Sequence, residues 1–252
     1  MNYAKKIFAL SLIVSTQTTF AAFYAGFQMG YNIFSGNRQE SLDDQNLFLQ
    51  RNNPVALLDK NLKSSAPTLG LCTGFRKVVK NFIFDIEPFL NVDSFKKSEF
   101  ATTAVPISAN NTINLFSVSE FKKLLSTGLN LHAGYQFGKN ITAYALCGFQ
   151  IARFQYSAQQ SLRGFTNNLI TSVDFLSRSS KYLSGLSLGA GFEFVYKKLR
   201  FVPEFVYTKF SKFQDKLACS PTVSTNTDFP DFNKVNIKPS EFKVALKVLM
   251  SI

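Results

Sequence analysis

The sequence has few of the residues that carry catalytic, metal and redox chemistry. It contains one histidine, three cysteines and no tryptophan. An odd number of cysteines does not make a disulfide framework, and Cys72, Cys147 and Cys219 lack the spacing of a zinc site. We therefore expect structural thiols, no metal and no other cofactor.

Long apolar runs are also missing. Beyond the N-terminus no apolar run reaches the ~18 residues that a membrane-spanning helix needs, although 46% of the residues are hydrophobic. The chain instead has 28 phenylalanines and 9 tyrosines, which favour β-strands and suit a lipid-facing sheet. The formal net charge is +12, but the basic residues are scattered. They form no nucleic-acid-binding motif, so we expect no nucleic-acid partner.

The N-terminus has the pattern of a secretory signal peptide. The pair Lys5–Lys6 precedes an apolar run over Ile7–Val14, and small residues follow at a cleavage position after Ala21. We predict a signal peptide over residues 1–21 and one mature domain over residues 22–252.

Eight segments alternate apolar residues with polar or small residues, and the clearest of them is Thr127–Phe137. A β-strand turns successive side chains to opposite faces, so each segment has one apolar and one polar face. The predicted strands cover residues 23–34, 68–76, 81–93, 124–137, 141–154, 181–196, 200–213 and 242–252. Pro88 lacks a backbone donor, so we expect a bulge near it.

Short and long connections alternate between these strands. Short turns are expected at 77–80, 138–140 and 197–199, and long loops at 35–67, 94–120, 155–180 and 214–239, with a helical turn at Val55–Leu58. This pattern predicts an all-β fold: a closed eight-stranded antiparallel up-and-down transmembrane β-barrel with four long extracellular loops and short periplasmic turns.

A soluble secreted barrel of the lipocalin type is the second alternative, because it also has eight strands and a signal peptide. One face of the segment 181–196 carries three glycines, Ser187 and Glu193, which would line a poor apolar cavity. Its other face, with Leu186 and Leu188 among its residues, would form a large exposed apolar patch on a soluble protein.

Three segments carry a family resemblance. Ala22–Tyr31 resembles the first strand of small OmpA-like outer-membrane β-barrel proteins, Val202–Phe210 is similar to their penultimate strand, and Gly134–Phe137 fits before a turn. The resemblance implies a porin-family or surface-antigen protein in the outer membrane of a Gram-negative bacterium, inserted by the barrel-assembly machinery. Members usually end in an aromatic residue, whereas this sequence ends in Leu249–Ile252, and it has no peptidoglycan-binding domain after the last strand.

The alternation places charged and polar side chains inside such a barrel. The ion-pair candidates are Arg76, Asp85, Glu87, Glu193, Glu204, Lys243 and Lys247, and the polar interior residues are Gln28, Asn130, His132 and Gln136. Because buried charges need partners, we expect Glu204 to pair with Lys243 or Lys247. Arg76 should similarly face Asp85 or Glu87. An eight-stranded barrel is filled by such side chains, so a packed ionic plug is expected, and a narrow gated channel is the alternative.

Catalysis is not expected. Lipid A deacylases of this size class use an outward-facing histidine with a serine two residues away, but the neighbours of His132 at that spacing are Asn130 and Gly134. Function is therefore expected in the loops, as adhesion to a host-surface ligand or as a surface antigen, or in stabilising the membrane. Basic residues predicted at the outer strand ends would meet lipopolysaccharide phosphates: Arg38, Arg51, Lys122, Lys123, Arg178 and Lys181. Those predicted at the turns would meet phospholipid headgroups or peptidoglycan: Lys77, Lys80, Lys139, Lys197 and Lys198.

Overall fold

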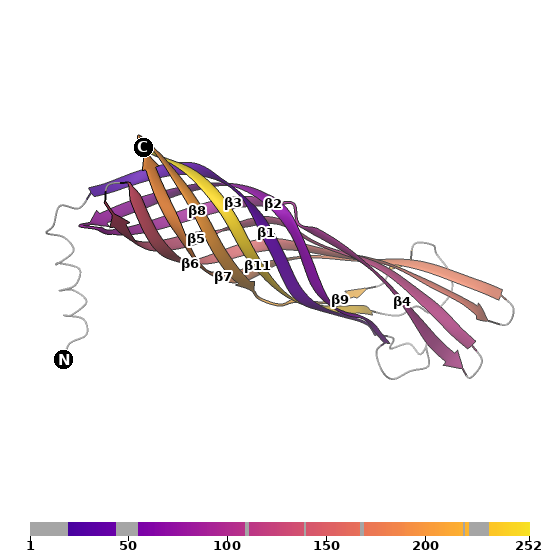
Figure 1. Cartoon of the computed structure of the whole chain (residues 1–252). Coiled ribbons are helices and arrows are strands. Elements are labelled where there is room, and N and C mark those ends of the chain that lie inside the picture. The colour runs from indigo at the N-terminus through magenta and orange to yellow at the C-terminus, as the bar shows by residue number, and fades with distance from the viewer. Residues whose placement is uncertain are drawn as a thin grey trace, which may run out of the picture.

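The computed structural model describes residues 20–43, 55–108, 111–138, 140–166, 169–218, 220–221 and 232–252. The described chain is almost entirely β-strand (Figure 1). The strands are β1 (Phe20–Asp43), β2 (Val55–Val79), β3 (Phe82–Asp93), β4 (Lys96–Ser108), β5 (Asn111–Phe137), β6 (Ile141–Thr166), β7 (Leu169–Tyr196), β8 (Leu199–Phe210), β9 (Phe213–Ala218), β10 (Ser220–Pro221) and β11 (Phe232–Ser251). No helix in the described ranges is long and apolar enough to cross a membrane.

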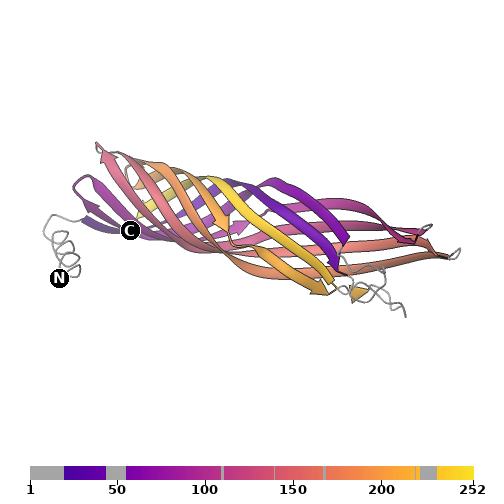
Figure 2. The same ribbon diagram turned by 90° about the horizontal axis from the view of Figure 1, so that it is seen from below.

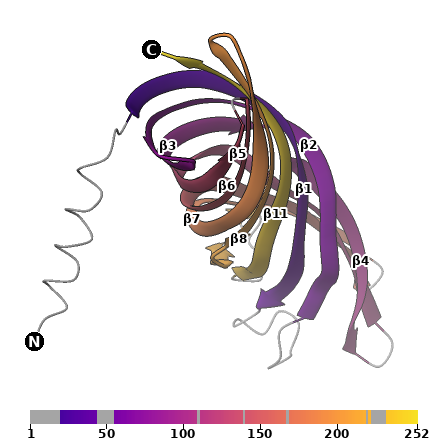
Figure 3. The same cartoon turned by 60° about the vertical axis from the view of Figure 1, so that its left-hand side comes forward.

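Eight strands form a continuous antiparallel ring in the order β1-β2-β3-β5-β6-β7-β8-β11. The ring is continuous because β11 pairs with β1 as well as with β8. Figure 3 shows these strands curving around a common axis. The predicted number of strands and their antiparallel order are therefore confirmed.

One end of the ring carries the short turns, as predicted. They include Lys80–Asn81, Gly138 and Asn140, and Lys197–Lys198. Three of these positions have left-handed backbone angles, with φ of 56° at Lys80, 72° at Gly138 and 55° at Lys197. The beginning of β1 and the end of β11 lie at the same end, where the Ile252 N–H donates to the Phe23 carbonyl over 3.0 Å.

The other end of the ring differs from the prediction, because the strands run far beyond the expected boundaries. The strands β5, β6 and β7 have 27, 26 and 28 residues. The expected long loops at 35–67, 94–120, 155–180 and 214–239 are therefore wrong for most of their length. The helical turn expected at Val55–Leu58 is also wrong, because this segment belongs to β2 and pairs with β1. The predicted signal peptide falls on residues 1–19, which lie outside the described residues, and on the first two residues of β1.

Farther from the short turns, the ring divides into two facing sheets, which we together call the outer extension. The β2–β3 ladder ends at the pair Thr68–Asp93, and the β7–β8 ladder ends at Gly185–Phe210. The next residue on β2 is Pro67, which has no N–H to continue the ladder. Above these points the strands β2-β1-β11-β9 form one sheet and β4-β5-β6-β7 form the other (Figure 2).

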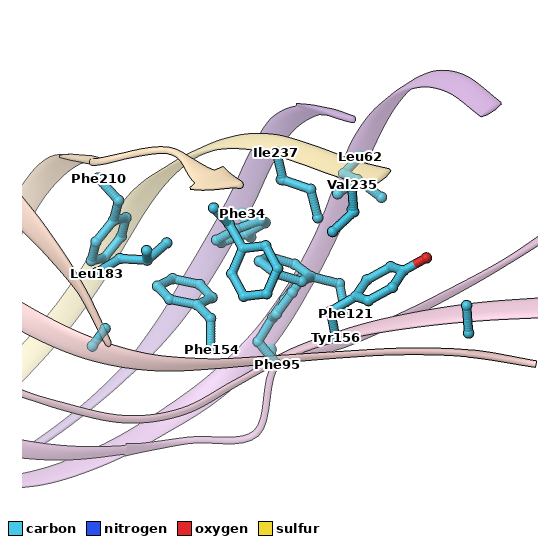
Figure 4. Packing of buried hydrophobic residues seen from close by; sticks show 14 of the residues in the cluster. Phe34, Leu62, Phe95, Phe121, Phe154, Tyr156, Leu183, Phe210, Val235 and Ile237 are labelled. Atoms are coloured by element: carbon cyan, nitrogen blue, oxygen red, sulfur yellow. The ribbon is translucent and has the colours of Figure 1, made fainter. Parts of the chain in front are cut away.

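The core of the outer extension lies between these two sheets and is largely aromatic (Figure 4). Phe95 lies in the break between β3 and β4, Phe213 follows the break between β8 and β9, and both side chains are buried. The Phe95 ring lies 4.2 Å from that of Phe34, and the Phe213 ring lies 5.5 Å from that of Phe121. Phe121 also stacks on Phe154 at 5.3 Å. The phenylalanines at the two breaks therefore pack one sheet against the other.

The bulge expected near Pro88 is wrong. The pairing of β2 with β3 omits Pro88 and its neighbour Glu87 but has the same register on both sides of them, from Cys72–Phe89 to Phe75–Ile86. Side chains alternate between exposed and buried along all of β3. Proline therefore removes one ladder donor here without inserting an extra residue.

Candidate functional site

The outer surface of the ring next to the turns is an apolar band. Large hydrophobic side chains point outward from every ring strand, and Leu186, Leu188 and Tyr182 on β7 are 66–70% exposed. On β3 the band extends from Phe82 to Val92. This segment contains about 33 Å of strand at ~3.3 Å per residue. With the ~40° tilt of barrel strands it covers a height of about 25 Å, which equals the apolar band of membrane barrels.

Beyond this band the polarity of the two faces inverts. The outward positions of β6 change from Phe149 and Ile151 to Arg153, Gln155 and Ser157. The inward positions become apolar at the same height, where they form the aromatic core of the outer extension. Within the band the inside is mainly polar and the outside apolar, whereas directly beyond it the inside is mainly apolar and the outside mainly polar.

A β-bulge on β5 produces part of this change. The register of β5 against β6 shifts between Lys123 and Leu125. Lys123 and Ser126 are therefore both buried, although strict alternation would place them on opposite faces. The prediction that Lys123 lies at the outer surface is wrong for this reason. Arg38 is also fully buried, so it is not an outer cation either, and Arg51 lies outside the described residues.

The polar interior of the band contains three groups of ion pairs, of which the first lies near the turns. Arg76 donates to Asp85 over 2.8 and 2.6 Å and to Glu193 over 2.6 and 2.7 Å. Arg200 lies 3.5 Å from Glu193, and its guanidinium carbon is 4.4 Å from the ring centre of Tyr24. The sequence-predicted pair Arg76–Asp85 is thus part of a larger network across four strands.

The second group surrounds Lys247. Its Nζ lies 2.7 Å from Glu204 and also contacts Glu87. His132 Nε2 lies 3.3 Å from Glu204, and the Tyr144 hydroxyl donates to the same carboxylate over 2.7 Å. These side chains come from five strands, so their ion pairs and hydrogen bonds connect opposite walls of the ring.

The carboxylates of Glu87 and Glu204 and the imidazole of His132 offer ligand atoms that all lie within 4.8 Å of one another. Such a set resembles a metal site in composition. The ammonium of Lys247, however, contacts both carboxylates. The positive charge that a metal ion would supply is therefore already present in the chain.

The third group lies at the outer edge of the band and was not predicted. Lys123 Nζ lies 2.6 Å from Glu241 and 3.0 Å from Asp93. Asp93 also accepts hydrogen bonds from Asn32 over 2.7 Å and from Ser126 over 3.0 Å. Alternation alone would have placed Asp93 and Glu241 inside, but their partner Lys123 is brought there only by the bulge.

The remaining predicted interior residues lie as follows. Lys243 is buried, with Nζ 5.5 Å from the ring centre of Phe89, so Lys247 and not Lys243 makes the ion pair with Glu204. Gln28 and Asn130 are buried, and the side chain of Gln28 donates to Asn91. Gln136 is half-buried beside the turns, where its backbone N–H donates to Asn81.

The charges inside the ring nearly cancel. Five cations face six carboxylates: Arg76, Lys123, Arg200, Lys243 and Lys247 against Asp85, Glu87, Asp93, Glu193, Glu204 and Glu241. A filled interior of nearly balanced charge does not attract one sign of ion. Two free thiols are described, a buried one at Cys72 and an exposed one at Cys147, while Cys219 lies outside the described residues.

No protein-family model and no curated protein matches this sequence. Among solved structures, the chain is similar to Neisserial surface protein A, at 8% identity over 92% of this chain and 99% of that one, with a TM-score of 0.38. It is also similar to Ail, the attachment invasion locus protein of Yersinia pestis, at 10% identity over 90% and 99%, with a TM-score of 0.29. The outer membrane protease OmpT from Escherichia coli matches at 8% identity over 95% and 100%, with a TM-score of 0.32. TM-scores this low support no argument about function, which therefore depends on the residues of this chain.

Proposed function

We propose that the chain is a closed β-barrel of a Gram-negative outer membrane, with a structural or surface-interaction role and no catalysis. The observation that carries this proposal is the inversion of polarity at the edge of the apolar band. An apolar outside over a polar inside suits lipid, whereas a polar outside over an apolar core suits water. The boundary between these two regions crosses the ring strands that continue beyond the band, and β3 and β8 end near it, as expected at the surface of a membrane.

The lengths of the connections between strands also support an orientation of the barrel in the membrane. Short turns lie on the periplasmic side of such barrels and the longer connections on the outside. The turns that include Lys80–Asn81, Gly138 and Asn140, and Lys197–Lys198 would then face the periplasm, and the outer extension would face the environment. Figure 1 shows the hairpins β4–β5 and β6–β7 projecting furthest from the turns, which suits adhesion or antigen presentation through their ends.

Three other functions have less support. A soluble ligand-binding barrel would place its apolar face inside, but here that face points outward. A narrow channel would need a path through three ionic groups and the aromatic core above them. A catalytic role has little support because His132, the only histidine in the sequence, is buried beside Glu204.

Membrane fractionation followed by gel electrophoresis of unheated and boiled samples tests the proposal. A folded lipid-embedded barrel is expected in the outer-membrane fraction, with a mobility that changes on boiling. Recovery from the soluble periplasm without a mobility change would refute the inside–outside assignment. Planar-bilayer recordings separate the structural role from the channel, because the filled interior predicts no unitary conductance steps.

A further inference from the structure

A hollow on the outer face of β5, β6 and β7 lies directly beyond the apolar band. It has a volume of about 470 Å³, and its exposed lining is polar: Glu120, Lys122, Gln155, Ser157, Arg178 and Ser180. The strand register places these residues in two adjacent rows, Glu120–Ser157–Arg178 and Lys122–Gln155–Ser180. We call this surface the basic hollow.

The basic hollow carries a net positive charge. Lys96 and Lys122 each place Nζ 2.5 Å from the Glu120 carboxylate. Burial opposes the charged form of Glu120, but the hydrogen bonds from the two lysines outweigh it and lower the pKa of this carboxyl. Lys122 and Arg178 line the hollow, Lys96 adjoins it through its ion pair with Glu120, and Arg153 adjoins it by donating to Ser180 over 3.1 Å. Four cations therefore stand against one carboxylate, a net charge of 4 − 1 = +3.

The height of the basic hollow matches a lipid headgroup layer. Lys122 lies three residues beyond Leu125, the exposed apolar residue of β5 at the edge of the band, and Ser180 lies two residues from the exposed Tyr182. At ~3.3 Å per residue along a tilted strand, this is roughly 5–10 Å beyond the edge of the band. The headgroup layer of a bilayer occupies about the same 5–8 Å on each side.

We infer that the basic hollow binds the phosphorylated sugars of lipopolysaccharide. This inference depends on the proposed membrane orientation. Lysine and arginine bind phosphate oxygens through charge-assisted hydrogen bonds. The serine hydroxyls and the Gln155 amide beside them donate and accept hydrogen bonds, as sugar hydroxyls require. A phosphate carried on a sugar uses both kinds of group, whereas a small phospholipid headgroup uses only the cations.

The test compares two double variants with the same change of charge. Lys122→Gln/Arg178→Gln removes two cations of the basic hollow. Lys63→Gln/Lys238→Gln removes two exposed lysines from β2 and β11, on the opposite sheet at a similar height. The full mature chain, purified in a zwitterionic detergent, is titrated with labelled lipopolysaccharide, with dephosphorylated lipopolysaccharide and with phosphatidylglycerol vesicles.

The Lys122→Gln/Arg178→Gln variant should bind lipopolysaccharide about 10- to 30-fold more weakly, since each cation near a membrane surface contributes about a fivefold factor. The control variant should change affinity less than about threefold. Wild type should bind dephosphorylated lipopolysaccharide and phosphatidylglycerol at the level of the first variant. Equal losses in both variants, or equal affinity for phosphatidylglycerol, would overturn the inference. The mobility change on boiling separates these outcomes, because its absence in wild type refutes the membrane assignment itself.

Discussion

Lys247 should contribute most to the stability of the ring interior. It is 1% exposed, and its ammonium contacts the carboxylates of Glu87 and Glu204, which are equally buried. Replacing it by methionine keeps the volume of the side chain but leaves two buried carboxylates without their shared cation. Removal of one partner from a buried ion pair costs about 3–5 kcal/mol. We expect Lys247→Met to lower the free energy of unfolding by this amount.

Urea titration of the folded fraction in detergent measures the effect, because the folded barrel and the unfolded chain are expected to migrate differently on unheated gels. With a slope of about 2 kcal/mol per M urea, the midpoint should fall by about 1.5–2.5 M. The matched control is Lys243→Met, on the same strand and also buried. Its ammonium lies against Phe89, a contact worth about 1 kcal/mol, so its midpoint should fall by about 0.5 M.

A second variant tests the cause of the loss. Adding Glu87→Gln and Glu204→Gln to Lys247→Met removes the uncompensated charges, and most of the lost stability should return, because a neutral interior of similar volume avoids the desolvation cost. If Lys247→Met unfolds at the same urea concentration as Lys243→Met, or if the triple variant is no more stable than Lys247→Met, the reasoning is refuted.

Three further predictions concern the band and the outer extension. Leu188→Arg, near the middle of the band, should destabilise the barrel in lipid vesicles by about 2–4 kcal/mol, and Tyr182→Arg at its edge by about 0–1 kcal/mol; equal effects would contradict a lipid-facing band. Phe121→Ala should cost about 3–5 kcal/mol of local stability, seen as faster proteolysis of the outer extension while the mobility change on boiling remains. Burial raises the pKa of Asp215, but hydrogen bonds from Ser179 and Lys181 outweigh this and lower it overall. The stabilisation by Asp215 is therefore present above the pKa of the unfolded state and lost as pH falls through the lower folded value. Proteolysis of the outer extension should become faster in acid, and this acceleration should be smaller in Asp215→Asn. Identical pH profiles of proteolysis for the wild type and Asp215→Asn would exclude a stabilising role of Asp215.

The long strands change how a surface role would operate. The hairpins β4–β5 and β6–β7 are formed by paired strands, and the aromatic core packs against their bases. A binding surface on such strands is ordered before a partner arrives, so less conformational entropy is lost on binding. The basic hollow lies at the base of the same strands.

Alternation of side chains along the chain by itself determined the strand number, the turns and the apolar band. Two-residue periodicity is a local property, so the outward placement of Leu186 and Leu188 and the burial of Glu193 followed from sequence alone. The same periodicity placed Asp85, Glu87, Glu204 and Lys247 inside the ring.

Only the tertiary structure decided the outer extension. Its strands are rich in serine, asparagine and glutamine on their outward face, which is also the composition of loops. Their inward face is apolar only because a second sheet covers it, and which sheet faces which depends on contacts between distant segments, such as Phe34 with Phe95. The burial of Lys123 depends on a bulge of one residue, which reverses the parity that alternation assigns. The β8–β11 register does not choose between Lys243 and Lys247 as the partner of Glu204, because Glu204 lies opposite Ala245, two residues from either lysine. Lys247 makes the pair where Glu87 of β3 also contacts its ammonium, an arrangement that exists only in the closed ring of strands.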